Sequence, residues 1–235
     1  SSLVLEALFL TVKNRTKTKL ERPTGASHQH LFIGRVSDMN FRLLLLLPFI
    51  LLLQSCQDAR MPLLSSGATI VAFGDSLTAG VGASKGADYP AQLAQMSHLT
   101  VINAGISGET TSKGLKRLPG ILAKHSPELL ILLEGGNDFL RNHPLAETKR
   151  NLAAMIELAQ SQGATVLLIA VPKKSLFLTP SPIYAELAQE YQLVLLEETL
   201  SELLGSPSKK SDTIHLNDSG YRVLAEAINH HIDST

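Results

Sequence analysis

Five short apolar runs, separated by amphipathic stretches, occupy the sequence from about residue 68 onward and limit the folds that the chain can adopt. Several of these runs are almost continuously apolar, which is typical of strands buried on both faces of a parallel sheet. The runs are Thr69–Phe73, Leu99–Asn103, Leu129–Leu133, Thr165–Val171 and Leu193–Leu196. Their spacing leaves room for a helix between successive strands, as parallel pairing requires.

The stretches between the runs carry apolar residues three and four positions apart, the spacing of an amphipathic helix. The helical stripes comprise Tyr184, Leu187, Ala188 and Tyr191; Leu152, Met155, Ile156 and Ala159; Tyr221, Leu224 and Ile228; and Leu115, Leu118 and Leu122. Within the last stripe, Pro119 predicts a distortion of the helix. Alternating strands and helices predict an α/β fold, a three-layer α/β/α sandwich whose parallel sheet has about five strands.

The first 55 residues differ in character from the rest. Residues 1–38 contain no Met, and we expect them to be an upstream extension outside the working protein. Met39 then begins a short basic segment that leads into an apolar run, Leu43–Leu53. This run is shorter than the roughly 20 apolar residues that a membrane-spanning helix needs. Residues 39–55 are therefore predicted to be an export signal.

The signal ends in Leu53-Gln54-Ser55-Cys56, which resembles the lipobox of bacterial lipoproteins. The resemblance implies cleavage before Cys56, acylation of that residue, and an exported protein held by a lipid anchor in the periplasm or cell envelope of a bacterium. Cys56 is the only cysteine, so an internal disulfide is excluded. The alternative is an ordinary secretory signal followed by an incidental cysteine. Residues 56–67 would then be a tether and residues 68–235 the folded domain.

The balance of charged residues also changes at residue 56, where the predicted signal ends. Lys and Arg outnumber Asp and Glu by seven to three before residue 56, and the counts from residue 56 onward are fourteen and eighteen. The body is therefore mildly acidic. It contains no basic patch of the kind that neutralises phosphates, so nucleic acid is not an expected partner.

Four clusters of polar residues carry the candidate chemistry, and three of them directly follow an apolar run. In open α/β sheets, functional groups gather beyond the carboxyl ends of the strands. The clusters are residues 74–80 (GDSLTAG), 103–110 (NAGISGET), 134–138 (EGGND) and 211–217 (SDTIHLN). The positions of the first three predict a site at the carboxyl edge of the sheet.

Ser76 is the candidate nucleophile of this site. A serine hydroxyl needs a base, usually a histidine oriented by a carboxylate. His215 has Asp212 three residues before it, close enough for the carboxylate to reach the ring. The oxyanion formed by attack on an ester needs preorganised donors, and the candidates are the backbone N–H groups of Ser76 and Gly108 and the side-chain amide of Asn137. This set predicts acyl transfer to water.

The four clusters resemble, in order and spacing, the conserved blocks of the SGNH hydrolases (the GDSL esterase/lipase superfamily). The resemblance extends over residues 69–232 and is nearest to bacterial thioesterase I/lysophospholipase and arylesterase enzymes. It implies a flavodoxin-like sandwich fold and no cofactor. By the family pattern, Ser76, Asp212 and His215 are catalytic, and Ser76, Gly108 and Asn137 form the oxyanion hole. One departure is Leu216, where the family often has proline, which affects only the expected shape of that loop.

Each candidate also has a purely structural alternative. Ser76 could simply cap a helix, Asp212 could cap the last helix, and Asn137 could belong to a turn. Gly108 could be present only because the backbone at this position needs the conformational freedom of glycine. We interpret Asp75 as a structural hydrogen-bonding residue and not as a catalytic one.

The predicted substrates are small-molecule acyl esters: lysophospholipids, acyl thioesters or aryl esters. The segment from Pro172 to Ser181, which contains Leu176, Phe177 and Leu178, is hypothesised to line or cover an acyl-chain pocket. Three alternatives remain: a carbohydrate O-acetyl esterase, a lipid-anchored binding protein without turnover, and a flavodoxin-like cofactor binder. No His, Cys and Asp residues have the spacing of metal ligands, so no metal is expected.

Overall fold

The structure is a computed structural model that describes residues 61–173 and 178–233. Within these residues, five parallel strands form one sheet in the order β2-β1-β3-β4-β5. The strands are β1 (Thr69–Gly74), β2 (Thr100–Gly105), β3 (Leu129–Leu133), β4 (Thr165–Ile169) and β5 (Val194–Leu196). Each predicted apolar run overlaps one strand, and the predicted α/β fold with its parallel sheet is confirmed.

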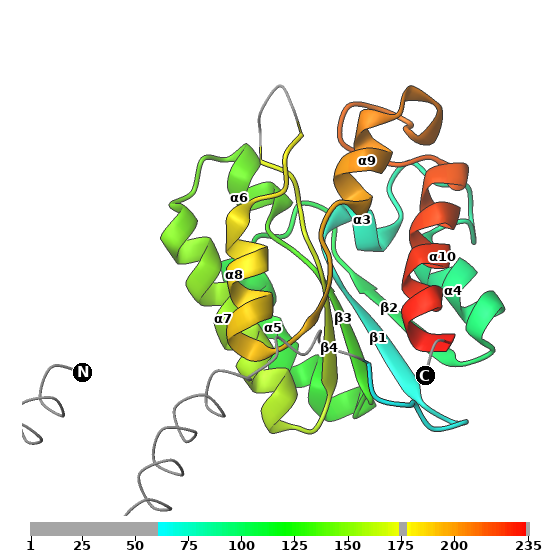
Figure 1. The fold of residues 1–235 in the computed structure, drawn as a ribbon, viewed down its shortest axis with the longest axis vertical. Coiled ribbons are helices and arrows are strands. Elements are labelled where there is room, and N and C mark those ends of the chain that lie inside the picture. Colours follow the sequence, from blue (N-terminus) through cyan, green and yellow to red (C-terminus); the bar gives the residue numbers. More distant parts are fainter. Residues whose placement is uncertain (1–60, 174–177, 234–235) are drawn as a thin grey trace, which may run out of the picture. The chain divides into compact units, whose positions relative to one another are not determined.

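Helices cover both faces of the sheet (Figure 1). They are α3 (Ser76–Ala79), α4 (Tyr89–Ser97), α5 (Thr111–His125), α6 (Gly136–Leu140), α7 (Leu145–Ser161), α8 (Pro182–Tyr191), α9 (Thr199–Gly205) and α10 (Asp218–Asp233), with a short 3-10 helix, η2 (Pro207–Lys209). Helices α5, α7 and α8 lie on one side, and α4 and α10 pack together on the other. Helix α5 continues through the exposed Pro119. The proline, for which the sequence predicted a distortion, therefore does not interrupt the helix.

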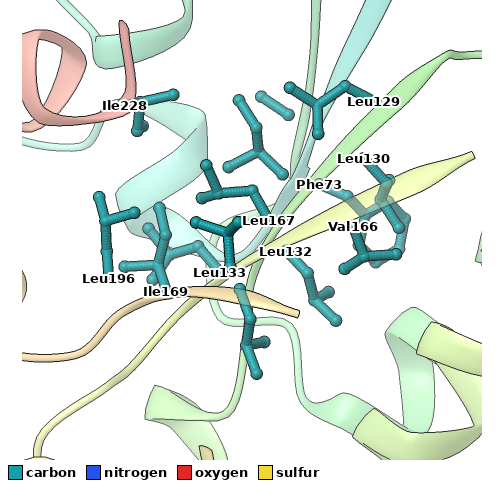
Figure 2. Close-up of a cluster of buried hydrophobic side chains, with 14 of the residues drawn as sticks. Phe73, Leu129, Leu130, Leu132, Leu133, Val166, Leu167, Ile169, Leu196 and Ile228 are labelled. Atoms are coloured by element: carbon teal, nitrogen blue, oxygen red, sulfur yellow. The ribbon is translucent and has the colours of Figure 1, made fainter. Parts of the chain in front are cut away.

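The core lies on both faces of the sheet because β3 is completely buried. Alternate residues of a strand point to opposite faces. In Figure 2, Leu130 lies beside Phe73 and Val166, whereas Leu133 points away from that group. Both layers of the sandwich are therefore apolar, which explains why β3 is a continuous run of leucine and isoleucine.

The chain enters the domain at the amino-terminal edge of the sheet. Met61 is buried in the core, and the backbone N–H of Ser65 donates to the side-chain carboxylate of Glu128, the residue before β3, at 3.0 Å. Pro62 lines a surface hollow together with Thr165 and Val194, the first residues of β4 and β5. The described part of the predicted tether, residues 61–67, thus contacts the domain. The upstream extension, the signal and Cys56 lie outside the described residues.

The opposite, carboxyl edge of the sheet carries the polar clusters. Helices α3 and α6 begin where β1 and β3 end, and α9 lies at the same end of the sheet (Figure 1). Among the described helices, none has the length and hydropathy required to cross a membrane.

Candidate active site

Ser76 lies on the sharp connection between β1 and α3. The Asp75 carboxylate accepts a hydrogen bond from the Leu77 N–H at 3.1 Å and so caps the helix that Ser76 begins. The helix packs directly on the neighbouring strand: a Cβ on Gly105 would lie 2.1 Å from the backbone nitrogen of Ala79. Only glycine permits this approach. The turn holds Ser76 at the carboxyl edge of the sheet with its side chain half-buried.

His215 and Asp212 lie in the loop that precedes α10. One carboxylate oxygen of Asp212 accepts the backbone N–H groups of Ile214 and His215, each at 2.8 Å. The other carboxylate oxygen lies 2.7 Å from Nδ1 of His215. The backbone bonds orient the carboxylate, so its second oxygen faces the ring. The hydrogen bond from His215 also holds the pKa of Asp212 below its usual value.

The Nε2 atom of His215 lies 3.0 Å from the Ser76 Oγ. Because ionised Asp212 can only accept, Nδ1 of the neutral ring must be the donor, which leaves Nε2 as an acceptor for the serine hydroxyl proton. The His215 side chain is 13% exposed and that of Asp212 is 50% exposed. This chain of hydrogen bonds can remove a proton from Ser76 when the hydroxyl attacks a carbonyl carbon.

Asn137 reaches the same region from α6. Its Nδ2 donates one hydrogen bond to Asp75 at 3.2 Å. A primary amide has two N–H donors, so a second hydrogen remains available. Gly135 precedes the helix with a φ of 114° in the left-handed region, which glycine adopts at little cost.

Gly108 lies in the loop between β2 and α5, with a φ of 77°. The loop starts beside Ser76, since the N–H of Ile106 donates to the carbonyl oxygen of Gly74 at 3.0 Å. In the described part of the chain, the backbone N–H groups of Ser76 and Gly108 donate no hydrogen bond. Both amides are therefore available to a ligand, as oxyanion donors must be.

A cavity of about 190 Å³ opens beside Ser76 and is largely apolar. Ser76 and Asn137 line it together with Val171, Leu178 and Leu204. Further lining residues are Asp75, Leu77, Gly136, Phe139, Leu140, Pro172, Lys173, Thr213 and Ile214. Of the segment hypothesised to line an acyl pocket, Pro172, Lys173 and Leu178 are found here, whereas Leu176 and Phe177 lie outside the described residues.

Comparison with known proteins agrees with this geometry. Residues 72–223 match the GDSL-like Lipase/Acylhydrolase family, which covers well over half of the chain. The chain belongs to this family. The resemblance to SGNH hydrolases that the four clusters indicated is therefore confirmed. As a GDSL-family protein with esterase relatives, it is a carboxylic ester hydrolase.

Two curated relatives match about two thirds of the chain. The thioesterase 1/protease 1/lysophospholipase L1 of Escherichia coli (strain K12) is 32% identical over 166 residues, which are 67% of this chain and 80% of that protein. An arylesterase of Vibrio mimicus is 34% identical over 173 residues, 68% of this chain and 85% of that protein. The esterase EstA from Pseudoalteromonas sp. shares the fold, with a TM-score of 0.64 at 23% identity over 71% of this chain and 97% of that one.

Beside Ser76 lies a group of buried carboxyl groups, of which sequence reasoning singled out only Asp75. Burial raises the pKa of Asp75 to about 6 and that of Glu134 to about 10. Glu109 is also buried and forms an ion pair with Arg117, whose Nε lies 3.0 Å from each carboxylate oxygen. Glu134 is the first residue of the 134–138 cluster, but nothing in the sequence marks it as buried. Among the described residues, no group of three His, Cys, Asp or Glu could hold a metal ion.

Proposed function

We propose that the protein hydrolyses acyl esters through an acyl-serine intermediate on Ser76. The observation that carries the proposal is the continuous hydrogen-bond chain from Ser76 through His215 to Asp212, at the mouth of an apolar cavity. Serine, histidine and a carboxylate in this order perform nucleophilic acyl transfer on unrelated folds.

In the proposed reaction, His215 Nε2 takes the hydroxyl proton as Ser76 Oγ bonds to the carbonyl carbon. The carbonyl oxygen becomes an oxyanion that accepts hydrogen bonds from the amides of Ser76 and Gly108 and from Asn137 Nδ2. When the tetrahedral intermediate collapses, the leaving group departs with the proton from Nε2. Water then gives a proton to His215 as its oxygen bonds to the carbonyl carbon of the acyl-enzyme. When this second intermediate collapses, His215 returns the proton to Ser76 Oγ, and the carboxylic acid is released.

The apolar lining of the cavity supports the proposal that it binds the acyl chain of the substrate. Leu178, Leu204 and Val171 can contact methylene groups, each contributing about 0.8 kcal/mol when buried. We propose lysophospholipids, acyl thioesters and aryl esters as the substrate class, in line with the activities named for the relatives. A carbohydrate O-acetyl esterase has little use for such an apolar cavity.

Covalent labelling by a fluorophosphonate tests the nucleophile. The native protein should be labelled, whereas Ser76→Ala should not. Ser161→Ala is a matched control, because this exposed hydroxyl at the end of α7 bonds, among the described residues, only to the carbonyl oxygen of Leu158. Equal labelling of Ser76→Ala and the native protein would overturn the assignment.

The substrate class is tested with p-nitrophenyl esters of increasing acyl length and with an acetylated sugar. A kcat/KM that increases from acetate to medium-chain esters, with slow turnover of the acetylated sugar, supports the acyl-chain proposal. The reverse preference would support the O-acetyl esterase. No turnover of any ester, with an intact fold, would support a binding protein.

We further propose that the enzyme is exported and anchored through Cys56, which the signal at residues 39–55 supports. Metabolic incorporation of a labelled fatty acid into the full chain tests this proposal. Incorporation into the native chain and not into Cys56→Ala is expected. Soluble, unlabelled native protein would leave an ordinary secretory signal as the correct interpretation.

A further inference from the structure

The two oxyanion donors outside the Ser76 turn come from different elements of the fold. Gly108 follows β2 and Asn137 follows β3, and β1 lies between these two strands in the sheet. No strand ladder therefore joins the two donor segments directly. Pairing with β1 fixes where both segments leave the sheet, but beyond the strand ends their separation depends on contacts between the loops. A shift of about 1 Å in such a site can cost 10²-fold in rate.

Arg141 provides a contact that joins the two donor segments. Its backbone N–H donates to the carbonyl oxygen of Asn137 at 3.1 Å, which closes the end of α6. Its guanidinium Nη2 donates to the carbonyl oxygen of Gly108 at 3.0 Å. A single residue is thus bonded through its main chain to one donor residue and through its side chain to the other.

A second contact fixes the same loop from the interior. The buried carboxylate of Asp138, the residue after Asn137, accepts the N–H of Thr111 at 2.9 Å and the Thr111 hydroxyl at 2.8 Å. Thr111 is the first residue of α5 and lies three positions after Gly108. Helix α6 therefore holds the Gly108 loop at two points, one buried and one at the surface.

At the surface, Gly108 depends on Arg141 for its packing. Apart from its chain neighbours, the only described atom within 4 Å of a Cβ built on Gly108 would be the Arg141 Nη2, at 3.7 Å. Beyond Arg141, this side of the loop is open. Loss of the guanidinium would leave this peptide group held, among the described residues, only by the bond from the Glu109 N–H to the Ile106 carbonyl oxygen at 3.2 Å. Rotation of the glycine would then redirect its own amide.

We propose that Arg141 is a positioning residue that holds the Gly108 amide at the correct separation from the Asn137 amide. The proposal rests on the acyl-transfer function proposed for Ser76. Arg141 acts through the carbonyl oxygen of Gly108 and not through contact with the substrate. It should therefore affect the stabilisation of the oxyanion and leave ground-state binding of the acyl chain largely unchanged.

The test compares Arg141→Gln and Arg141→Lys with Arg150→Gln. Arg150 is an exposed arginine of α7, and it forms no hydrogen bond or ion pair in the described part of the chain. Ester hydrolysis is measured per Ser76 titrated with a fluorophosphonate, so that misfolded protein does not count. Arg141→Gln should lower kcat about tenfold, less than the 10²–10³ for complete loss of a donor, with KM within about twofold. Arg141→Lys should recover most of kcat, and Arg150→Gln should behave as the native enzyme.

Two further measurements separate positioning from other roles. An alkylboronic acid forms a tetrahedral anionic adduct with serine and so resembles the oxyanion intermediate. In Arg141→Gln, the affinity for this acid should fall by the same factor as kcat. The affinity for the fatty-acid product should not change. The ratio of native to variant kcat should also be the same at low and high salt, since a long-range charge effect would be screened.

An unchanged kcat per active site in Arg141→Gln would overturn the inference. A raised KM with unchanged kcat would also overturn it, because Arg141 would then bind substrate. If Ser76→Ala retains full activity, the proposed function itself fails, whatever Arg141 does. The two failures are therefore distinguishable.

Discussion

The side chain of Asn137 donates a hydrogen bond to the buried carboxylate of Asp75 at 3.2 Å, directly beside Ser76. Asp75 accepts this bond on one oxygen and the N–H of Leu77 on the other. Asp75 thus contacts both the helix that begins with Ser76, the proposed nucleophile, and Asn137, a proposed oxyanion donor. This finding agrees with the structural role expected for Asp75.

Replacement of Asp75 by asparagine should therefore reduce turnover. Asparagine has one oxygen, so either the Leu77 N–H or the Asn137 amide loses its acceptor. We expect kcat to fall about tenfold or more while KM changes little, because a donor that stabilises the transition state is misaligned. Steady-state kinetics on a p-nitrophenyl ester checks this result. An unchanged kcat in a folded Asp75→Asn variant would contradict it.

Asp212→Asn should reduce kcat by about 10⁴, the loss known for the equivalent change in a serine triad. The asparagine oxygen can keep the two backbone N–H bonds at residues 214 and 215, but its NH₂ group would then face His215 Nδ1 and favour the wrong tautomer. Because Asp212 is half exposed, the fold should not suffer. Turnover and thermal unfolding of the same sample check both parts. A loss below tenfold would show that Asp212 does not orient the histidine.

Glu134→Gln should stabilise the protein, increasingly so as the pH rises. Burial, followed by the negative charges of Asp75 and Glu109, raises the pKa of Glu134 from 4.5 to about 10 in the folded state. Between these values the folded protein holds a proton that the unfolded chain releases, so the free energy of unfolding falls with rising pH, by up to about 1.4 kcal/mol per unit. Glutamine removes this dependence. Urea unfolding at about pH 5, 7 and 9 measures how the free energy of unfolding of each protein depends on pH. Native and variant curves that stay parallel would contradict the prediction.

Leu204→Phe should change the acyl-length preference. Leu204 is buried on α9 and lines the cavity, so a larger side chain occupies space that the acyl chain needs. We expect kcat/KM for long-chain esters to fall about tenfold or more, equivalent to the loss of roughly two buried methylene groups. Turnover of the acetate ester is the internal control and should be nearly unchanged. Equal losses for every acyl length would place Leu204 outside the acyl-binding surface.

The sequence predicted the sheet well because buried parallel strands leave a strong local signal. Leu129–Leu133 is uninterrupted by polar residues and coincides with β3. The short edge strand β5 is also recognisable as an apolar run, although the structure extends it over only three residues. The exact ends of the strands depend on hydrogen bonds to neighbouring strands, which a single sequence does not reveal.

The principal site residues could be anticipated because Ser76, Gly108, Asn137, Asp212 and His215 belong to clusters with recognisable spacing. Their catalytic roles stay predictions until the substitutions above are made. The contact between Arg141 and Gly108 had no such signal, because it joins residues 33 positions apart. The burial of Glu134 was equally hidden, since a charged residue in the sequence is normally expected at the surface.

The entry of the chain beside Glu128 has a consequence for the proposed lipid anchor. Met61 and Ser65 fix the chain at the edge of the sheet opposite Ser76. From Cys56 to Met61 the polypeptide can reach at most about 17 Å. If Cys56 carries the proposed lipid, a tether this short would favour an orientation in which the cavity beside Ser76 faces away from that bilayer. Such an enzyme would act on molecules that arrive from the aqueous side or from a facing membrane, and its lipid would determine where the reaction occurs without supplying the substrate.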